Sequence, residues 1–130
     1  MAWQFSSDRP IYIQVSEQIV SGILTGEYAR GQRLPSVREL AVEAAVNPNT
    51  VQRAMSELES VGLICTQRNT GKFVTEEERV IEVAREKRGE ALVRDFFTGM
   101  AALGYTQTQA IDVLTEFIPK EGKADERGNA

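Results

Sequence analysis

The sequence predicts a mainly α-helical chain with one small β-hairpin. Helices are indicated by apolar residues at helical spacing, several of which follow side chains that can cap a helix. The hairpin is indicated by two short apolar runs around Arg68–Gly71, where Asn69 and Gly71 tolerate positive φ. Apolar residues make up 42% of the 130 residues, so a packed core is expected.

The first predicted helix begins near Pro10, a residue that suits the first turn of a helix. Its apolar face is formed by Tyr12, Val15, Ile19 and Ile23. The helix is expected to end near Thr25 and Gly26. A loop-like stretch over residues 26–35 follows, with glycine and proline as its breakers.

Two short helices joined by a tight turn come next. Ser36 and Glu39 have the spacing of a capping box, which predicts a helix that starts after Ser36. Ala45 and Val46 form the turn, and Asn47 is then expected to cap the second helix. Its buried face is predicted to hold Val51, Ala54, Met55, Leu58 and Val61.

The predicted hairpin has strands over 63–67 and 72–75 and follows directly, with Cys65 expected to be a small buried residue. A helix, a short helix, a tight turn, a further helix and a hairpin make up a winged helix-turn-helix. The sequence therefore predicts such a domain over residues 1–75.

Two further helices are predicted after this domain. Thr75 and Glu78 have capping-box spacing before a helix over about 76–103, and so do Thr106 and Gln109 before a helix that Pro119 stops. Residues 76–118 are thus expected to form a helical hairpin. The polar residues 119–130 are expected to be a disordered tail.

A helical hairpin of this size buries too little apolar surface to stand alone, so it is predicted to pair with a second copy of the chain. A two-fold symmetric pair of winged helices also matches an inverted-repeat operator. The residues expected in this dimer interface are Ile81, Leu92, Phe96, Phe97, Met100, Leu103, Leu114 and Phe117.

The residue inventory argues against an enzyme. Cys65 is the only cysteine and histidine is absent, which excludes an intramolecular disulfide, cysteine/histidine zinc sites and Ser-His-Asp or Cys-His catalysis. Glu76, Glu77 and Glu78 are interpreted as a helix start and not as a metal site. We expect no metal and no cofactor. Without a secretory signal or an apolar run of about 20 residues, the chain is expected to be cytoplasmic and free of the membrane.

The net charge of −4 belongs to the C-terminal part of the chain. Residues 1–74 hold seven basic and seven acidic side chains, whereas residues 75–130 hold eight and twelve. Between Arg30 and Lys72 there are six basic and four acidic residues. A locally basic face on the first domain is compatible with nucleic acid, although affinity must come from placed contacts and not from charge alone.

Three segments resemble one family of bacterial regulators. Residues 31–41, GQRLPSVRELA, closely resemble the G-x-x-L-P-S-x-R-E-L-A signature of the GntR family. Residues 46–54, VNPNTVQRA, resemble its recognition-helix segment in the V-N-P-N-T-V form of the YtrA-type subfamily, and residues 58–64 match the segment that leads into the wing. The resemblance covers residues 10–74. It implies a DNA-binding transcription regulator, expected to be a repressor, whose short helical tail serves dimerisation.

The resemblance and the physics of DNA recognition together suggest which residues meet the operator. Base contacts are expected from the start of the recognition helix, at Asn49, Thr50, Gln52 and Arg53. Contacts to the DNA backbone are expected from Arg33, Ser36, Arg38, Arg68 and Lys72. The wing departs from the R-G-x-G-T-F-V pattern of the family: Asn69 replaces a glycine and Lys72 a threonine.

Two alternatives stay open at this point. One is a winged helix that binds another protein and no operator, which the salt dependence of DNA binding distinguishes. The other is a regulator with a small-molecule effector at the dimer interface, where Phe96, Phe97 and Phe117 line a pocket and do not only pack. The sequence names no effector and no operator.

Overall fold

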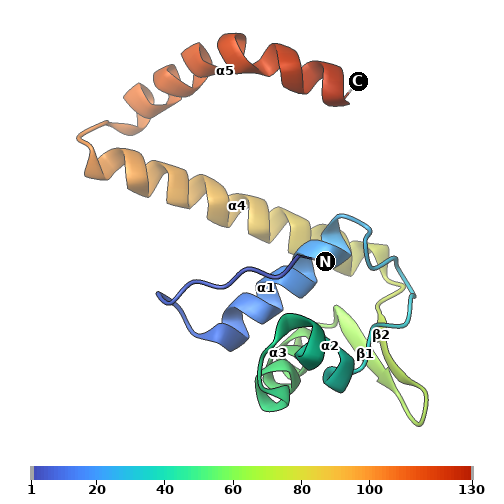
Figure 1. Cartoon of the computed structure of the whole chain (residues 1–130). Helices are drawn as coiled ribbons and strands as arrows, with labels where there is room; N and C mark the ends of the chain where they lie inside the picture. Colours follow the sequence, from blue (N-terminus) through green and yellow to red (C-terminus); the bar gives the residue numbers. More distant parts are fainter. Residues whose placement is uncertain (1, 130) are drawn as a thin grey trace. The chain divides into compact units, whose positions relative to one another are not determined.

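A computed structural model describes residues 2–129, and the side chains through residue 118. The chain divides into two compact units, Met1–Glu86 and Lys87–Ala130, and each is described by itself. The first unit contains α1 (Ile11–Leu24), α2 (Val37–Ala44), α3 (Pro48–Ser60), β1 (Ile64–Gln67), β2 (Gly71–Val74) and the first turns of α4 (Glu78–Ala102). This order confirms the predicted winged helix-turn-helix (Figure 1).

The core of the first unit lies between α1, α3 and the hairpin. Val15, Ile19 and Ile23 face it from α1, as predicted, and Met55 lies at its centre with no exposed surface. Val61 was also predicted to be buried but is 62% exposed. The reason is that α3 ends at Ser60, so Val61 is the C-cap and has left the apolar face of the helix.

The two helices of the helix-turn-helix begin where their capping residues predict. The Ser36 hydroxyl accepts a hydrogen bond from Glu39 N, and the Glu39 carboxylate accepts one from Ser36 N. Ala45 closes α2 with a left-handed φ of 57°. Because the chain turns sharply at this residue, Asn47 can cap α3 two positions later, with its side chain accepting from Asn49 N at 2.8 Å.

The hairpin β1–β2 is antiparallel, with Ile64 opposite Val74 and Gln67 opposite Gly71. The loop before α2 adds a short third segment, because Leu34 N donates to Lys72 O at 2.8 Å. Cys65 was predicted to be buried but is exposed. Successive side chains of a strand point to opposite faces, and here the core takes only the face that carries Ile64.

The capping box predicted at Thr75 and Glu78 is wrong. Thr75 is buried and still belongs to the extended chain, because its N–H donates to Leu63 O at 2.9 Å. Its hydroxyl accepts from Glu77 N, and α4 begins only at Glu78. The Glu78 carboxylate pairs with Arg30 instead of turning back to Thr75.

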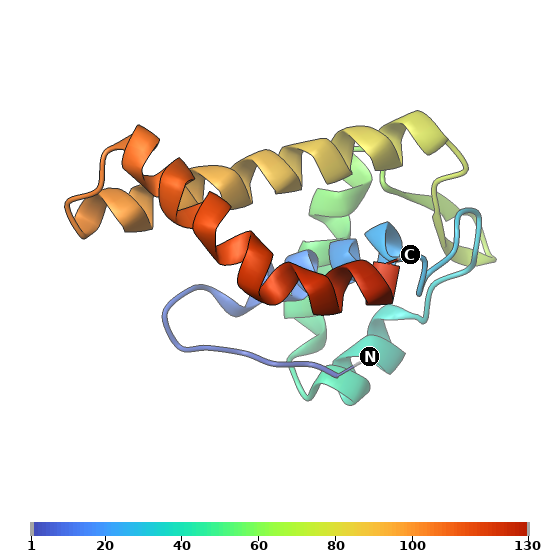
Figure 2. The same cartoon turned by 90° about the horizontal axis from the view of Figure 1, so that it is seen from above.

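The second unit consists of the rest of α4 and of α5 (Gln107–Asn129), between which the chain reverses direction (Figure 2). The capping box at Thr106 and Gln109 is confirmed by hydrogen bonds in both directions. The helix was predicted to stop at Pro119, but α5 continues past it; a proline removes one helical hydrogen bond and does not always end a helix. Over 119–129 the backbone continues as α5, where the sequence predicted a disordered tail over 119–130, and the side chains from 119 onward lie outside the described residues.

Candidate nucleic-acid interface

The start of α3 presents polar side chains on the face opposite to the core. Val51, Ala54 and Met55 are buried, whereas Asn49, Gln52 and Arg53 are exposed and Thr50 is half-buried. The structure thus brings together on one face the side chains that the sequence assigned to the bases. The buried and the exposed side chains lie on opposite sides because an α-helix turns by about 100° per residue.

Two of these exposed side chains, Gln52 and Arg53, are held in place by different contacts. The Gln52 amide makes one hydrogen bond in the structure, donating to Ser56 Oγ at 3.3 Å. Such a contact is easily exchanged for the edge of a base. The Arg53 guanidinium is more strongly held, because it lies 3.6 Å from the centroid of the Tyr12 ring of α1.

The start of α2 combines a capped N-terminus with exposed arginines. Ser36 is committed to the cap as an acceptor, but its O–H can still donate to a phosphate. The hydrogen bond that the Ser36 backbone N–H donates to the Glu39 carboxylate is the main cause that lowers the pKa of Glu39 below its usual range. Arg33 and Arg38 are exposed, and within residues 2–118 neither forms an ion pair, which leaves both available to phosphates.

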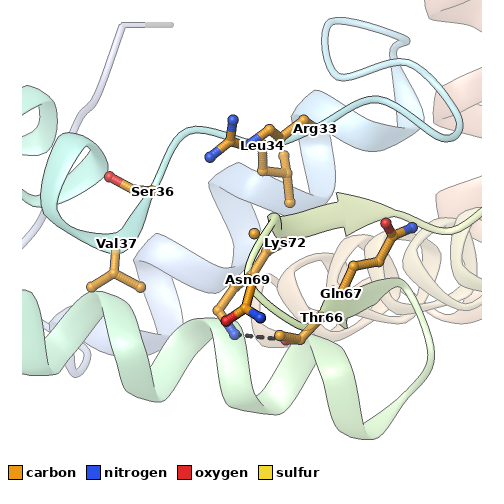
Figure 3. A pocket seen from close by; sticks show the side chains of 9 residues that line it. Arg33, Leu34, Ser36, Val37, Thr66, Gln67, Asn69 and Lys72 are labelled. Carbon is orange, nitrogen blue, oxygen red and sulfur yellow. Dashed lines mark hydrogen bonds between the residues drawn. The ribbon is translucent and has the colours of Figure 1, made fainter.

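A cavity of about 280 Å³ lies between the start of α2 and the hairpin (Figure 3). It is lined by Arg33, Leu34, Ser36, Val37, Thr66, Gln67, Asn69, Gly71 and Lys72. The hairpin side of this cavity is the predicted wing, and Asn69 at its tip has the left-handed φ of 66° that the sequence suggested. Arg68 is exposed at the tip and forms no ion pair with the described side chains.

Lys72 differs from the other predicted backbone contacts. Its ammonium group donates to Glu59 Oε1 at 2.5 Å and to Thr66 Oγ1 at 2.9 Å, the second of which is drawn in Figure 3. Its side chain is only 18% exposed. The charge that was predicted to meet a phosphate is therefore paired within the protein.

Tyr12 and Glu59 are the two residues of this face that sequence reasoning missed. Tyr12 follows the apolar repeat of the first helix, so it was interpreted as core. Glu59 lies near the end of α3 and looks like an ordinary solvated carboxylate. Neither the spacing nor the composition of the sequence indicates that each one meets a basic side chain from another element.

The helices of the second unit leave many apolar side chains exposed. Leu103 is 75% exposed and Phe117 57%, while Phe96 and Phe97 are half-buried against each other. Among the described residues of this unit, only Ala110 is buried. Ile81, which the sequence assigned to the dimer interface, instead lies in the core of the first unit, so it has little surface left for a partner.

The described residues hold neither a cluster of metal ligands nor a membrane-spanning helix. No group of three or more carboxylate, cysteine or histidine side chains is placed to hold a metal ion. In the same part of the chain, no helix has the length and the apolar character needed to span a bilayer.

Comparison with known proteins gives consistent matches. The family model described as bacterial regulatory proteins, gntR family, matches residues 11–74. The HTH-type regulator YhcF of Bacillus subtilis is 36% identical over 88% of this chain and 94% of its own length, and the transcriptional repressor YtrA of the same organism is 33% identical over 94% and 91%. A GntR family regulator from Listeria monocytogenes superposes with a TM-score of 0.79 and 40% identity, over 86% of this chain and 98% of the other.

Proposed function

Because this chain belongs to the GntR family of bacterial regulatory proteins, we propose that it represses transcription by binding an inverted-repeat DNA operator as a homodimer. Membership of the family makes it a DNA-binding transcription regulator and not an enzyme. The finer proposal rests on a difference between the two units. The first exposes polar side chains at the start of α3, which we call the reading helix, and the second exposes apolar side chains on both of its helices.

The proposed mode of binding places the start of α3 in the major groove. Asn49 and Gln52 can each form a bidentate pair with adenine, Arg53 can do the same with guanine, and Thr50 adds a hydroxyl or methyl contact. Arg33, Ser36 and Arg38 would hold phosphates beside the groove, and Arg68 would bring the wing to the DNA backbone. Phosphate contacts fix the position of the domain, whereas the α3 contacts supply the sequence preference.

The proposed dimer covers the apolar surface of the second unit. So many exposed apolar side chains on two helices are unusual for a monomer, and burying them in a two-fold interface stabilises the helices as well. The interface we propose contains Leu92, Phe96, Phe97, Met100, Leu103, Leu114 and Phe117. Ile81 is left out because the core of the first unit already buries it.

The repressor assignment is supported by the similarity to YtrA, which is named a transcriptional repressor and matches nearly the whole chain. A dimer bound across a promoter excludes other proteins from the same DNA. In a reporter strain, deleting the gene for the chain should raise expression from a promoter that carries the operator, and restoring the gene should lower it.

Sedimentation velocity at micromolar concentration tests the dimer. The parent should sediment at twice the monomer mass, and replacing both Leu114 and Phe117 with glutamate should give a monomer. Thr108→Glu is the matched control, because it adds a charge to the same helix at an exposed polar position. A monomeric parent that binds an inverted repeat tightly would contradict the proposal.

A further inference from the structure

The hairpin is tied to the end of the reading helix by three polar side chains. Lys72 on β2 donates to Glu59, in the last turn of α3, at 2.5 Å and to Thr66 on β1 at 2.9 Å. The triangle closes with the Thr66 hydroxyl, which donates to Glu59 Oε2 at 2.7 Å. We call these three residues the wing brace.

Glu59 lies in the last turn of α3, a position that does not favour a carboxylate in an isolated helix. The C-terminus of a helix carries partial negative charge, which disfavours an acidic side chain in the last turn. The hydrogen bond from Lys72, and then that from Thr66, lowers the pKa of Glu59 below its usual range, so this carboxylate is ionised at neutral pH. The stabilising partner of Glu59 is therefore the hairpin and not its own helix.

A phosphate contact by Lys72 would require this pair to separate. The ammonium group is mostly covered, with 18% of the side chain exposed, and Glu59 is 31% exposed beside it. Moving Lys72 to a phosphate would leave the Glu59 carboxylate without its cation and close to another negative charge. The wing tip already offers Arg68, which is exposed and unpaired within the described residues, for the same task.

We propose that Glu59 and Lys72 are positioning residues that hold the wing at a fixed angle to α3, and that Lys72 does not neutralise a DNA phosphate. This inference rests on the proposed contact between the wing and DNA through Arg68. A fixed angle lets the wing and the reading helix meet the operator in one register, without ordering a mobile hairpin on binding.

The salt dependence of operator binding separates positioning from phosphate contact. Each phosphate that a cation neutralises makes log K fall more steeply with log salt concentration, which adds about 0.9 to the magnitude of the slope. The test uses the full chain and an operator selected from random DNA. The pair Glu59→Ala with Lys72→Ala keeps the net charge, and Arg68→Ala is the matched variant that removes a free cation from the same hairpin.

The alanine pair should bind about twofold to fivefold more weakly, with the slope of the parent, because an ion pair that is partly open to solvent contributes modestly and no phosphate contact is lost. Arg68→Ala should lower the slope by about 0.9. Exchanging the charges, with Glu59→Lys and Lys72→Glu, should recover most of the parent affinity because the brace can form in reverse. A lower slope for the alanine pair, or a folded exchanged variant that stays weak, overturns the proposal.

Hydrogen exchange in the free protein distinguishes failure of the brace from failure of the proposed wing contact. If Arg68→Ala changes neither affinity nor slope, the wing does not contact DNA. The brace is then judged by the amides of residues 66–72, which should exchange faster in the alanine pair and return toward the parent rate in the exchanged variant. Unchanged exchange in the alanine pair overturns the brace itself.

Discussion

The guanidinium carbon of Arg53 lies 3.6 Å from the centroid of the Tyr12 ring, so the first turn of α1 supports a side chain of the reading helix. A cation held over an aromatic face loses less rotational freedom when it meets a base. α1 thus contributes to the surface that we propose faces DNA as well as to the core. Its buried residues and Tyr12 come from the same apolar repeat.

Removing the ring should weaken operator binding without removing a charge. Tyr12→Leu should lower affinity by about 0.5–1 kcal/mol, the usual contribution of an exposed cation–π contact, and leave the salt slope unchanged. Tyr12→Phe keeps the aromatic face and should bind like the parent. Fluorescence anisotropy titrations at several salt concentrations measure both quantities. If the phenylalanine variant is as weak as the leucine variant, the hydroxyl and not the ring supports Arg53.

Base readers and phosphate binders should respond differently to alanine. Gln52→Ala or Arg53→Ala should reduce discrimination at one operator position by about 1–3 kcal/mol. Arg38→Ala should weaken specific and non-specific DNA alike and lower the salt slope. Competition with operators that carry single changes measures the preference. An Arg38→Ala variant with altered preference and the parent slope would mean that the roles are reversed.

The sequence predicted local structure where one short motif determines the geometry. Ser36, Asn47 and Thr106 each cap a helix as expected, because a capping interaction involves residues three or fewer positions apart. Thr75 has the same motif and does not cap, because the backbone of a distant residue, Leu63, already binds its N–H. The motif alone does not show that the Leu63 carbonyl competes with the Glu78 side chain for the Thr75 N–H.

The candidate site likewise contains features that local sequence predicts and contacts that it does not. The exposure of Asn49, Gln52 and Arg53 follows from helical periodicity, which the sequence displays directly. The pairing of Lys72 with Glu59 depends on how the hairpin folds back on α3, across 13 residues. Long-range contacts of this kind between two ordinary surface residues leave no signal in one sequence.

The capping box of α2 should make the free energy of unfolding depend on pH in the acidic range. Its hydrogen bonds lower the pKa of Glu39 from an ordinary value of 4.5, so the folded state favours the ionised form. Its contribution to stability is fully present above the ordinary pKa and is lost as pH falls through the lowered, folded-state pKa. Glu39→Gln keeps an acceptor for Ser36 N without titrating. Melting temperatures from circular dichroism should therefore fall less steeply below about pH 4.5 in this variant than in the parent. Parallel curves for the two proteins would contradict this assignment.

Operator affinity should depend on the second unit, although that part of the chain is not expected to touch DNA. A single winged helix offers few phosphate contacts and should bind a half-site weakly. Joining two copies makes the second contact intramolecular, with gains of about 10²–10⁴ where the geometry fits. The monomeric variant with glutamate at Leu114 and Phe117 should therefore keep the circular dichroism of a folded first unit and lose most of its affinity for the full operator.

Tethering separates the loss of dimerisation from damage to the reading surface. Two copies of the monomeric full-length variant, joined by a flexible linker long enough to span both half-sites, should recover part of the lost affinity on an inverted repeat. The same tethered protein should gain little on a single half-site, because its second domain then has no specific target. Recovery on the inverted repeat alone would show that the second unit acts by holding two readers together. A monomeric variant that binds the full operator as tightly as the parent would instead assign the exposed apolar helices another role, and an effector site between them would become the leading alternative.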